Sequence, residues 1–290
     1  MTRSKTTGEK FAVGVLPNAD RDENYIYTRE VCDFLQKRGY LPVLEPETAA
    51  AAGLSAFSPG GAVYEKTGFL TVLGGDGTML AASHKAAPYG TPLFGINLGR
   101  LGYLTDADRH DGLAALEKVL NGDCRYERRM MLAIDGDAAF ALKTDEKLAL
   151  NDVCLSRGGF GKLITFELYV NGMYMDTLRA DGVIVATPTG STAYNLSAGG
   201  PILSPDGEFT VITPVCPHAL YTRPWVINAR DAVTLCLTGE TSASVSLDGE
   251  NRLTLESGAR VSVCRAEYQT SVIKTSNVGF YEILRKKIGG

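Results

Sequence analysis

The segment Leu73-Gly74-Gly75-Asp76-Gly77-Thr78 combines three glycines, a carboxylate and a hydroxyl between an apolar stretch and a helix-like segment. Three glycines so close together cost backbone entropy unless the chain turns sharply or a ligand comes close. Free N–H groups at a strand-to-helix junction favour phosphate. Because Asp76 would repel a bare phosphate, we expect either a magnesium ion between the two or a hydroxyl that Asp76 activates. The alternative is a tight turn with Asp76 as a cap. Neither GxxxxGK[ST] nor GxGxxG describes the segment, so the usual nucleotide-binding loops do not explain it.

A second segment, residues 179–201, is an apolar stretch followed by a loop dense in glycine and hydroxyl side chains. Its hydroxyls and free N–H groups could satisfy many polar atoms of a sugar–phosphate ligand, and Ala193 and Tyr194 could form an apolar wall for a base. On composition alone, a Gly/Ser/Thr-rich surface loop is an equal alternative.

A third candidate site is the pair Asn151-Asp152. An amide next to a carboxylate can bind the two hydroxyls of a ribose, one group donating and the other accepting. The alternative is an Asx turn between strands.

Together these segments resemble one family. Residues 74–78 resemble the GGDGT motif shared by NAD kinases, 6-phosphofructokinases and diacylglycerol-type lipid kinases. Residues 179–201 resemble the long NAD kinase signature DGxxxxTPTGSTAYxLSAGGP, and residues 150–153 resemble that family's Asn-Glu/Asp pair. Residues 95–104, 214–224 and 246–250 extend the resemblance over the chain from about Gly74 to the end. Glu250 departs from the family's usual DGQ reading.

The resemblance implies an NAD kinase, which transfers the terminal phosphoryl group of ATP to the 2′-hydroxyl of the adenosine ribose of NAD and gives NADP. Asp76 would be the general base. A divalent cation such as Mg²⁺ would be carried by the nucleotide, with no metal site of the protein's own. Two alternatives stay open: a lipid or sugar kinase, which would lack TPTGSTAY, and a non-catalytic NAD or NADP sensor, which would not need Asp76.

The resemblance also assigns binding residues. Asn151 and Asp152 would hold the nicotinamide ribose, and Tyr103 would line the adenine side. Lys162 and Arg179 would lie near phosphates, and Asp181 near the nicotinamide or a ribose. The other residues expected at the substrates are Gly75, Gly77, Thr78, Thr192, Ala193, Tyr194, Asn195, Leu196, Ser197 and Glu250.

Two kinds of elements would position these residues. The first part alternates apolar strands (residues 11–16, 41–45, 68–73 and 92–96) with helical patterns (residues 22–38, 78–87 and 113–120), and predicts an α/β domain with a parallel, Rossmann-like sheet over residues 1–128. Residues 129–275 show period-two alternation and predict a mostly antiparallel β domain, with hairpins at Asp135-Gly136 and Asn171-Gly172. The segment 276–290 is expected to dock back on the body of the protein.

Composition narrows the partners. The chain has 290 residues and a net charge of −4, so it lacks the basic character of a nucleic-acid binder. Its six cysteines form no CxxC pair, which is typical of a reducing cytosol. The first ten residues lack the apolar stretch of a signal peptide, and no apolar run approaches the ~20 residues that span a bilayer. We therefore expect a cytoplasmic protein with NAD and ATP as partners, and the resemblance adds a homodimer or homotetramer.

Overall fold

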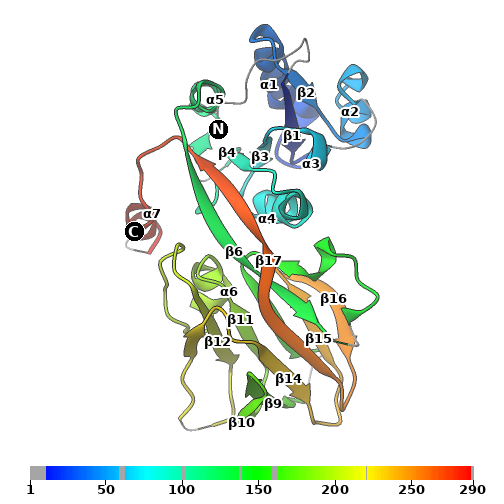
Figure 1. Cartoon of the computed structure of the whole chain (residues 1–290), viewed down its shortest axis with the longest axis vertical. Helices are drawn as coiled ribbons and strands as arrows, with labels where there is room; N and C mark the ends of the chain where they lie inside the picture. Colours follow the sequence, from blue (N-terminus) through cyan, green and yellow to red (C-terminus); the bar gives the residue numbers. More distant parts are fainter. Residues whose placement is uncertain are drawn as a thin grey trace. The chain divides into compact units, whose positions relative to one another are not determined.

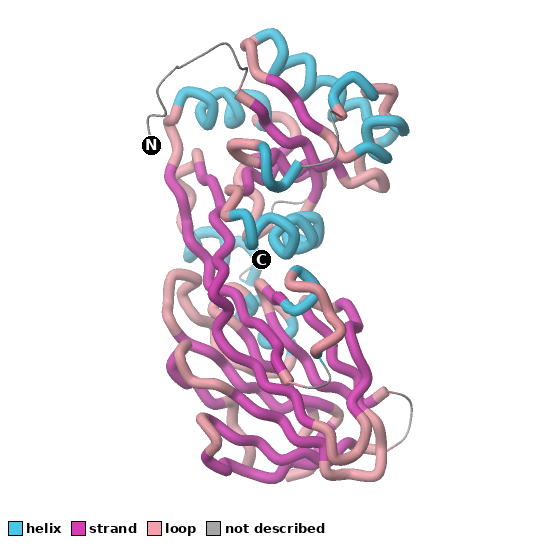
Figure 2. The backbone as a smooth tube through the Cα atoms, turned by 45° about the vertical axis from the view of Figure 1, so that its right-hand side comes forward, coloured by secondary structure: helices cyan, strands magenta, loops and turns pink. Residues whose placement is uncertain are grey.

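The structure is a computed structural model that describes residues 11–58, 63–99, 102–136, 139–158, 162–219 and 221–288. The chain forms two compact units: Met1–Glu127 together with Ser271–Gly290, and Arg128–Thr270. Two long strands, β6 (Arg125–Asp135) and β17 (Arg260–Lys274), contribute residues to both (Figure 1). Most of the helices belong to the first unit, whereas strands dominate the second (Figure 2).

The first unit contains a parallel sheet in the order β4-β3-β1-β2. Its strands are β1 (Ala12–Pro17), β2 (Leu41–Val43), β3 (Leu70–Gly74) and β4 (Leu93–Asn97). The short β5 (Ala107–Asp108) pairs with β4, and Val272 of β17 pairs with Leu93. Because β2 and β3 flank β1 on opposite sides, the strand order reverses between β1 and β3. Ligands of such sheets bind where the carboxyl ends of the strands meet at this reversal.

Helices cover both faces of this sheet. On one face, α1 (Ile26–Lys37) and α5 (Gly112–Asn121) bury apolar side chains against alternate strand residues, namely Val13, Val15, Phe94 and Ile96. On the other face lie α3 (Val63–Lys66) and α4 (Asp76–Ala86). Glycines permit their close approach, since a Cβ at Gly95 would lie 2.8 Å from Sδ of Met79 in α4. The remaining helices of this unit are α2 (Pro46–Ala51), α7 (Phe280–Ile288) and the 3₁₀ turns η1 (Glu23–Tyr25), η2 (Ser55–Phe57) and η3 (Ala87–Tyr89).

The second unit packs two antiparallel layers around one core. One sheet has the order β13-β12-β11-β8-β15-β16, with β8 (Asp152–Arg157), β11 (Gly182–Ala186), β12 (Phe209–Val215), β13 (Trp225–Asn228), β15 (Ala243–Leu247) and β16 (Glu250–Leu255). The other layer runs β10-β9-β14-β17, with β9 (Ile164–Val170), β10 (Met173–Ala180) and β14 (Val233–Leu237). Alternate apolar residues of both layers fill the space between them, among them Val153, Leu155, Phe166, Leu235 and Val263.

The outer face of the first of these sheets is also covered. All five residues of β11 are buried, because the chain that follows it folds back over the sheet. This returning segment contains η6 (Gly190–Thr192) and α6 (Tyr194–Ser197). Its Ala198 and Leu203 pack against Cys154 and Ile184. The glycine- and hydroxyl-rich sequence is therefore a packed layer rather than a free surface loop.

The predicted combination of an α/β domain and an antiparallel β domain is confirmed. The hairpin at Asn171-Gly172 is confirmed as well: both residues have positive φ (51° and 76°) and join the antiparallel β9 and β10. The hairpin at Asp135-Gly136 is wrong. β6 does pair with an antiparallel strand, β7 (Leu148–Ala149), but only after a longer connection that buries Ala139 in the core and includes η5 (Asp145–Lys147). None of the described helices is long and apolar enough to cross a bilayer.

Candidate functional site

The glycine-rich loop of the first unit joins β3 to α4. Gly75 caps the helix in extended conformation, and α4 begins at Asp76. Gly74 must be a glycine, since a Cβ there would lie 2.2 Å from Oγ1 of Thr78. The same Oγ1 accepts a hydrogen bond from Nδ2 of Asn18 at 3.1 Å, just beyond the carboxyl end of β1. The ends of β1 and β3 are thereby tied together at the reversal of strand order.

The Asp76 carboxylate is held by three consecutive backbone amides. Its Oδ2 accepts the N–H of Tyr103 at 2.8 Å, and its Oδ1 accepts those of Leu104 at 3.0 Å and Thr105 at 3.4 Å. A Cβ at Gly102 would lie 1.8 Å from Oδ1, so only glycine fits there. A carboxylate has about four lone-pair sites. Counting the contacts of the described residues, about one site, on Oδ2, therefore stays available, and the three amides hold it in a set direction.

Arg21 stands over the same loop. A Cβ built on Gly75 would lie 3.1 Å from its Nη1, and one built on Gly99 would lie 3.0 Å away. The arginine thus lies at the N-terminus of α4 while remaining solvent-exposed. Sequence reasoning missed Arg21 and Asn18. Their position directly after β1 was the available signal, because the carboxyl ends of parallel strands share one edge of the sheet.

Tyr103 lies between Asp76 and the C-terminal helix. Its ring centroid is 6.1 Å from that of Phe280, and Nζ of Lys287 stands 4.4 Å above the ring. Burial and the charge of Asp76 raise the pKa of the Tyr103 hydroxyl. The aromatic face that was predicted to line the adenine is therefore in contact with a lysine of α7.

The second unit contains a cavity of about 350 Å³ on the outer face of its sheet. Asp152, Cys154 and Ser156 alternate along β8 to form its floor, and Ala193 and Tyr194 come from the returning segment. The full lining is Asn151, Asp152, Cys154, Ser156, Ala193, Tyr194, Ser246, Asp248 and Gly249. Four predicted site residues, Asn151, Asp152, Ala193 and Tyr194, are thus brought together although they come from segments about forty residues apart.

Backbone contacts join these two segments directly. The carbonyl of Asn151 accepts the N–H of Thr187 at 2.8 Å, and Oγ1 of Thr187 donates to the carbonyl of Leu150 at 2.6 Å. A Cβ at Gly190 would lie 2.0 Å from the Asn151 carbonyl oxygen. The glycine of the TPTG sequence therefore serves close backbone packing.

Asp248 organises the cavity in the way that Asp76 organises its own loop. Its Oδ2 accepts the N–H of Leu150 at 2.7 Å, and its Oδ1 accepts those of Asn151 at 2.7 Å and Asp152 at 3.0 Å. Positive φ at Asp248 and Gly249 makes the tight turn between β15 and β16 that presents this carboxylate. Sequence reasoning chose Glu250 in this segment and missed Asp248. The Asp-Gly dipeptide between alternating strands was the signal for the turn.

Asp152 is the most perturbed carboxyl of the cavity. Burial, and next the charge of Asp248, raise its pKa to about 7. Near neutral pH it is therefore partly protonated and can either donate or accept a hydrogen bond. Such a group beside the Asn151 amide suits a vicinal diol.

One of the expected contact residues has a buried side chain. The side chain of Asn195 is fully buried, and its Nδ2 donates to the carbonyls of Ser191 and Pro201 at 3.0 and 3.1 Å. Its Oδ1 accepts the hydroxyl of Thr213 at 2.7 Å. Asn195 therefore fastens the returning segment to β12, and its side chain is not available to a ligand.

The other expected site residues do not line this cavity. Asp181 forms an ion pair with Arg157 at 3.0 Å, and Glu250 forms one with Arg252 at 2.6 Å. Thr192 bonds weakly to the carbonyl of Thr189, at 3.4 Å. The remaining ones are exposed (Gly77, Lys162, Arg179 and Ser197) or partly buried (Leu196). Their contacts with substrates stay predictions.

Comparison with known proteins covers both units. The model of the ATP-NAD kinase C-terminal domain matches residues 150–275, and that of the ATP-NAD kinase N-terminal domain matches residues 63–124. The chain is 38% identical over 282 residues to the NAD kinase of Thermoanaerobacter sp. (strain X514), covering 95% of this chain and 98% of that protein. It is 37% identical over 283 residues to the NAD kinase of Thiobacillus denitrificans, covering 95% and 96%.

Two solved structures have the same fold. One is an NAD kinase from Archaeoglobus fulgidus in complex with ATP, with a TM-score of 0.75, 25% identity, and coverage of 96% of this chain and 99% of that one. The other is yeast NADH kinase complexed with NADH, with a TM-score of 0.85, 23% identity, and coverage of 98% and 88%.

Proposed function

The chain belongs to the NAD kinase family, and we propose that Asp76 is the general base in its transfer of a phosphoryl group from ATP to NAD. The terminal phosphoryl group moves to the 2′-hydroxyl of the adenosine ribose, and the product is NADP. The family predicted from the sequence is thereby confirmed, and a lipid or sugar kinase is ruled out. The observation that carries the proposed role of Asp76 is its one remaining lone-pair site, held in direction by the amides of residues 103–105.

The proposed step needs little covalent chemistry from the protein. The 2′-oxygen forms a bond to the γ-phosphorus, while the bond from that phosphorus to the bridging oxygen breaks and ADP leaves with the electron pair. The hydroxyl proton passes to Oδ2 of Asp76. A base within hydrogen-bond reach contributes about 10²–10⁴ in rate, and positioning and charge neutralisation supply most of the rest.

We assign the triphosphate to the edge where β1 and β3 end. The N–H groups at the start of α4, a helix of eleven residues, favour negative charge. The Arg21 guanidinium above Gly75 and Gly99 can bind phosphate oxygens in a bidentate manner.

Magnesium is expected to arrive with ATP. Among the described residues there is no group of three or more His, Cys, Asp or Glu side chains placed to hold a metal ion. Because the remaining lone-pair site of Asp76 is assigned to the 2′-hydroxyl, the ion would be held by the substrate phosphates and by the several waters that Mg²⁺ usually keeps. When bound, the ion neutralises charge on the transferred group.

The cavity of the second unit is proposed to hold the nicotinamide ribose. Asn151 and Asp152 would bind its two hydroxyls, and Ala193 and Tyr194 would form the apolar wall beside it. Asp248 would act only by holding the backbone of residues 150–152. Gly75, Gly77, Thr78, Tyr103, Lys162, Arg179, Asp181, Thr192, Leu196, Ser197 and Glu250 remain proposed neighbours of the substrates.

The activity is tested by incubating the protein with NAD, ATP and magnesium and measuring NADP with an NADP-specific dehydrogenase. We expect NADP to form in step with ADP, and Asp76→Asn to abolish most of it. Consumption of ATP without formation of NADP would contradict NAD as the phosphoryl acceptor. Binding of NAD without any turnover would instead indicate a dinucleotide sensor.

A homodimer or homotetramer and a cytoplasmic location complete the proposal. Exposed Met173, Tyr174 and Met175 on the edge strand β10 support self-association through the second unit. Six free cysteines are consistent with a reducing compartment. Light scattering of the purified protein measures the assembly.

A further inference from the structure

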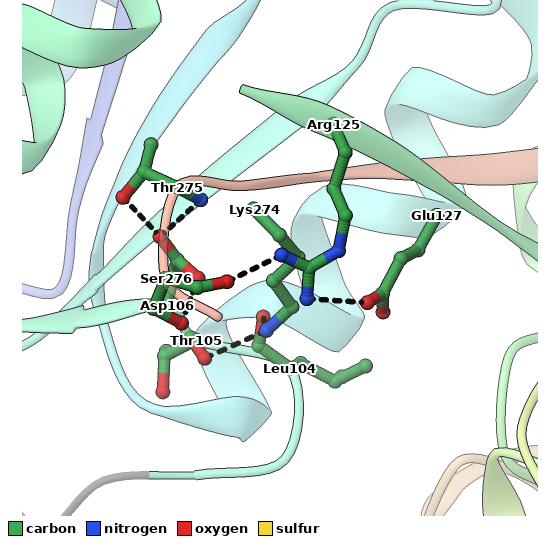
Figure 3. A network of polar contacts seen from close by, with 8 residues as sticks. All are labelled: Leu104, Thr105, Asp106, Arg125, Glu127, Lys274, Thr275 and Ser276. Atoms are coloured by element: carbon green, nitrogen blue, oxygen red, sulfur yellow. Dashed lines mark hydrogen bonds and ion pairs between the residues drawn. The ribbon is translucent and has the colours of Figure 1, made fainter. Parts of the chain in front are cut away.

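The last residue of β17 is a buried lysine in the first unit. Lys274 is only 5% exposed, and its Nζ donates to the carbonyl oxygens of Leu104 at 3.1 Å and Thr105 at 2.9 Å (Figure 3). These two residues belong to the loop whose N–H groups hold Asp76. We propose that Lys274 is a positioning residue for Asp76, acting through this loop. The proposal rests on the proposed role of Asp76 as the base.

The link runs through a single peptide group. The carbonyl of Leu104 and the N–H of Thr105 belong to the same peptide unit, so the Lys274 ammonium contacts one end and Oδ1 of Asp76 the other. In a buried site, hydrogen bonds in series polarise one another. The cation therefore makes this N–H a better donor to the carboxylate and fixes the plane of the peptide.

The end of β17 is itself fastened beside the loop. The Asp106 carboxylate accepts hydrogen bonds from the N–H of Thr275 at 2.7 Å, from the Thr275 hydroxyl at 2.6 Å and from the Ser276 hydroxyl at 3.1 Å. Arg125 donates to the Ser276 carbonyl and also pairs with Glu127 at 3.2 Å (Figure 3). Lys274 therefore approaches the loop from a strand end whose next two residues, Thr275 and Ser276, are held by hydrogen bonds to Asp106 and Arg125.

The choice of lysine supports a role for its charge. An ammonium taken out of water is costly unless it is well compensated. A methionine would fill the same length without that cost, but it would leave the two carbonyls without this donor. The charge is retained at the point where it can set the direction of the Asp76 loop.

The test compares Lys274→Met with Lys274→Arg by steady-state kinetics and by amide hydrogen exchange over residues 103–105. For Lys274→Met we expect kcat to fall by about 10- to 100-fold, KM for NAD to stay within two-fold, and exchange of these amides to accelerate. Lys274→Arg keeps the charge and donors, so its losses should be smaller. Val31→Ala is the control, because Val31 is a buried residue of α1, which packs on the face of the sheet opposite to α4. It should lower the melting temperature without changing kcat or this exchange.

A double-mutant cycle distinguishes positioning from general stability. If Lys274 acts through Asp76, Lys274→Met should lower kcat little further in the Asp76→Asn background. Multiplied losses would overturn the proposal, and so would unchanged kcat and exchange in the folded Met variant. If the Met variant does not fold, Lys274→Gln, which removes the charge but keeps an N–H donor, is measured against the same expectations. Full activity of the Asp76→Asn variant would reject Asp76 as the general base, but it would not affect the hydrogen-exchange result for Lys274→Met. Failure of the proposed function and failure of the positioning role can therefore be told apart.

Discussion

The carboxylate of Asp248 accepts the backbone N–H of Asp152 at 3.0 Å, and the two acidic side chains share one cavity. Burial raises the pKa of Asp152, and the Asp248 charge raises it further, to about 7. Since Asp152 is partly protonated near neutral pH, its side chain can present either a donor or an acceptor to a diol beside Asn151. It does so at the expense of stability.

The first prediction concerns that stability. Since the folded pKa of Asp152 lies above its ordinary value, the folded state retains a proton that the unfolded state releases. Asp152 makes its full contribution to the free energy of unfolding below about pH 4. This contribution declines as the pH rises and is lost by about pH 7, and its magnitude is at most about 4 kcal/mol. Asp152→Asn should therefore melt higher than the parent at pH 8 and lose this advantage at pH 4. Thermal unfolding followed by circular dichroism gives the melting temperatures at both pH values. If the difference in melting temperature between the two proteins is the same at pH 4 and pH 8, the raised pKa is contradicted. Glu250→Gln, an exposed carboxyl, is the control.

Asp76→Asn should lower kcat by about 10²-fold or more, with little change in NAD affinity. Part of this loss is geometric, because an amide has only one acceptor oxygen and its NH₂ would face a backbone N–H of the loop. Turnover and NAD binding measured against magnesium concentration separate the causes. Recovery of the rate at high magnesium would indicate a metal ligand, and a change within a few-fold would indicate a turn residue.

Arg21→Met should weaken ATP and not NAD. Loss of charge-assisted bonds to phosphate predicts a rise of about 10-fold in KM for ATP, at the low end for such bonds because Arg21 is exposed. Arg38→Met is the matched control, since Arg38 follows α1 and pairs with Glu117 on the surface. Equal effects of the two substitutions would remove Arg21 from the triphosphate site.

Lys287→Met tests the contact between α7 and Tyr103. If the adenine takes the face of Tyr103 that Lys287 now covers, the lysine must move, and its cation–π contact is lost. Such a contact at an exposed site is worth about 0.5–1 kcal/mol, so the variant should bind NAD about 2- to 5-fold more tightly. Isothermal titration calorimetry of NAD binding to the parent and to the variant measures this difference. Weaker binding would show instead that Lys287 contacts the dinucleotide.

The sequence by itself determined the local elements and the chemistry that they carry. Glycines 74, 75 and 77 around Asp76 predicted a strand-to-helix junction, and β3, Gly75 and α4 form it. Asn171-Gly172 predicted a hairpin because both residues tolerate positive φ, and it is there. These features depend on backbone preferences within a few residues, which the order of the residues states directly.

Only the tertiary structure decided which distant groups hold the site. Asp248 holds the backbone of Asn151, and Lys274 holds that of Leu104, through contacts with main-chain atoms that every residue possesses. Side-chain type therefore does not reveal the partner. Asn195 looked like a contact residue but is buried, because the returning segment folds onto β12 rather than lying open. Which strand ends meet, and hence that Arg21 stands over Gly75, follows from the strand order β4-β3-β1-β2, and that order is set by the packing of helices on both faces of the sheet.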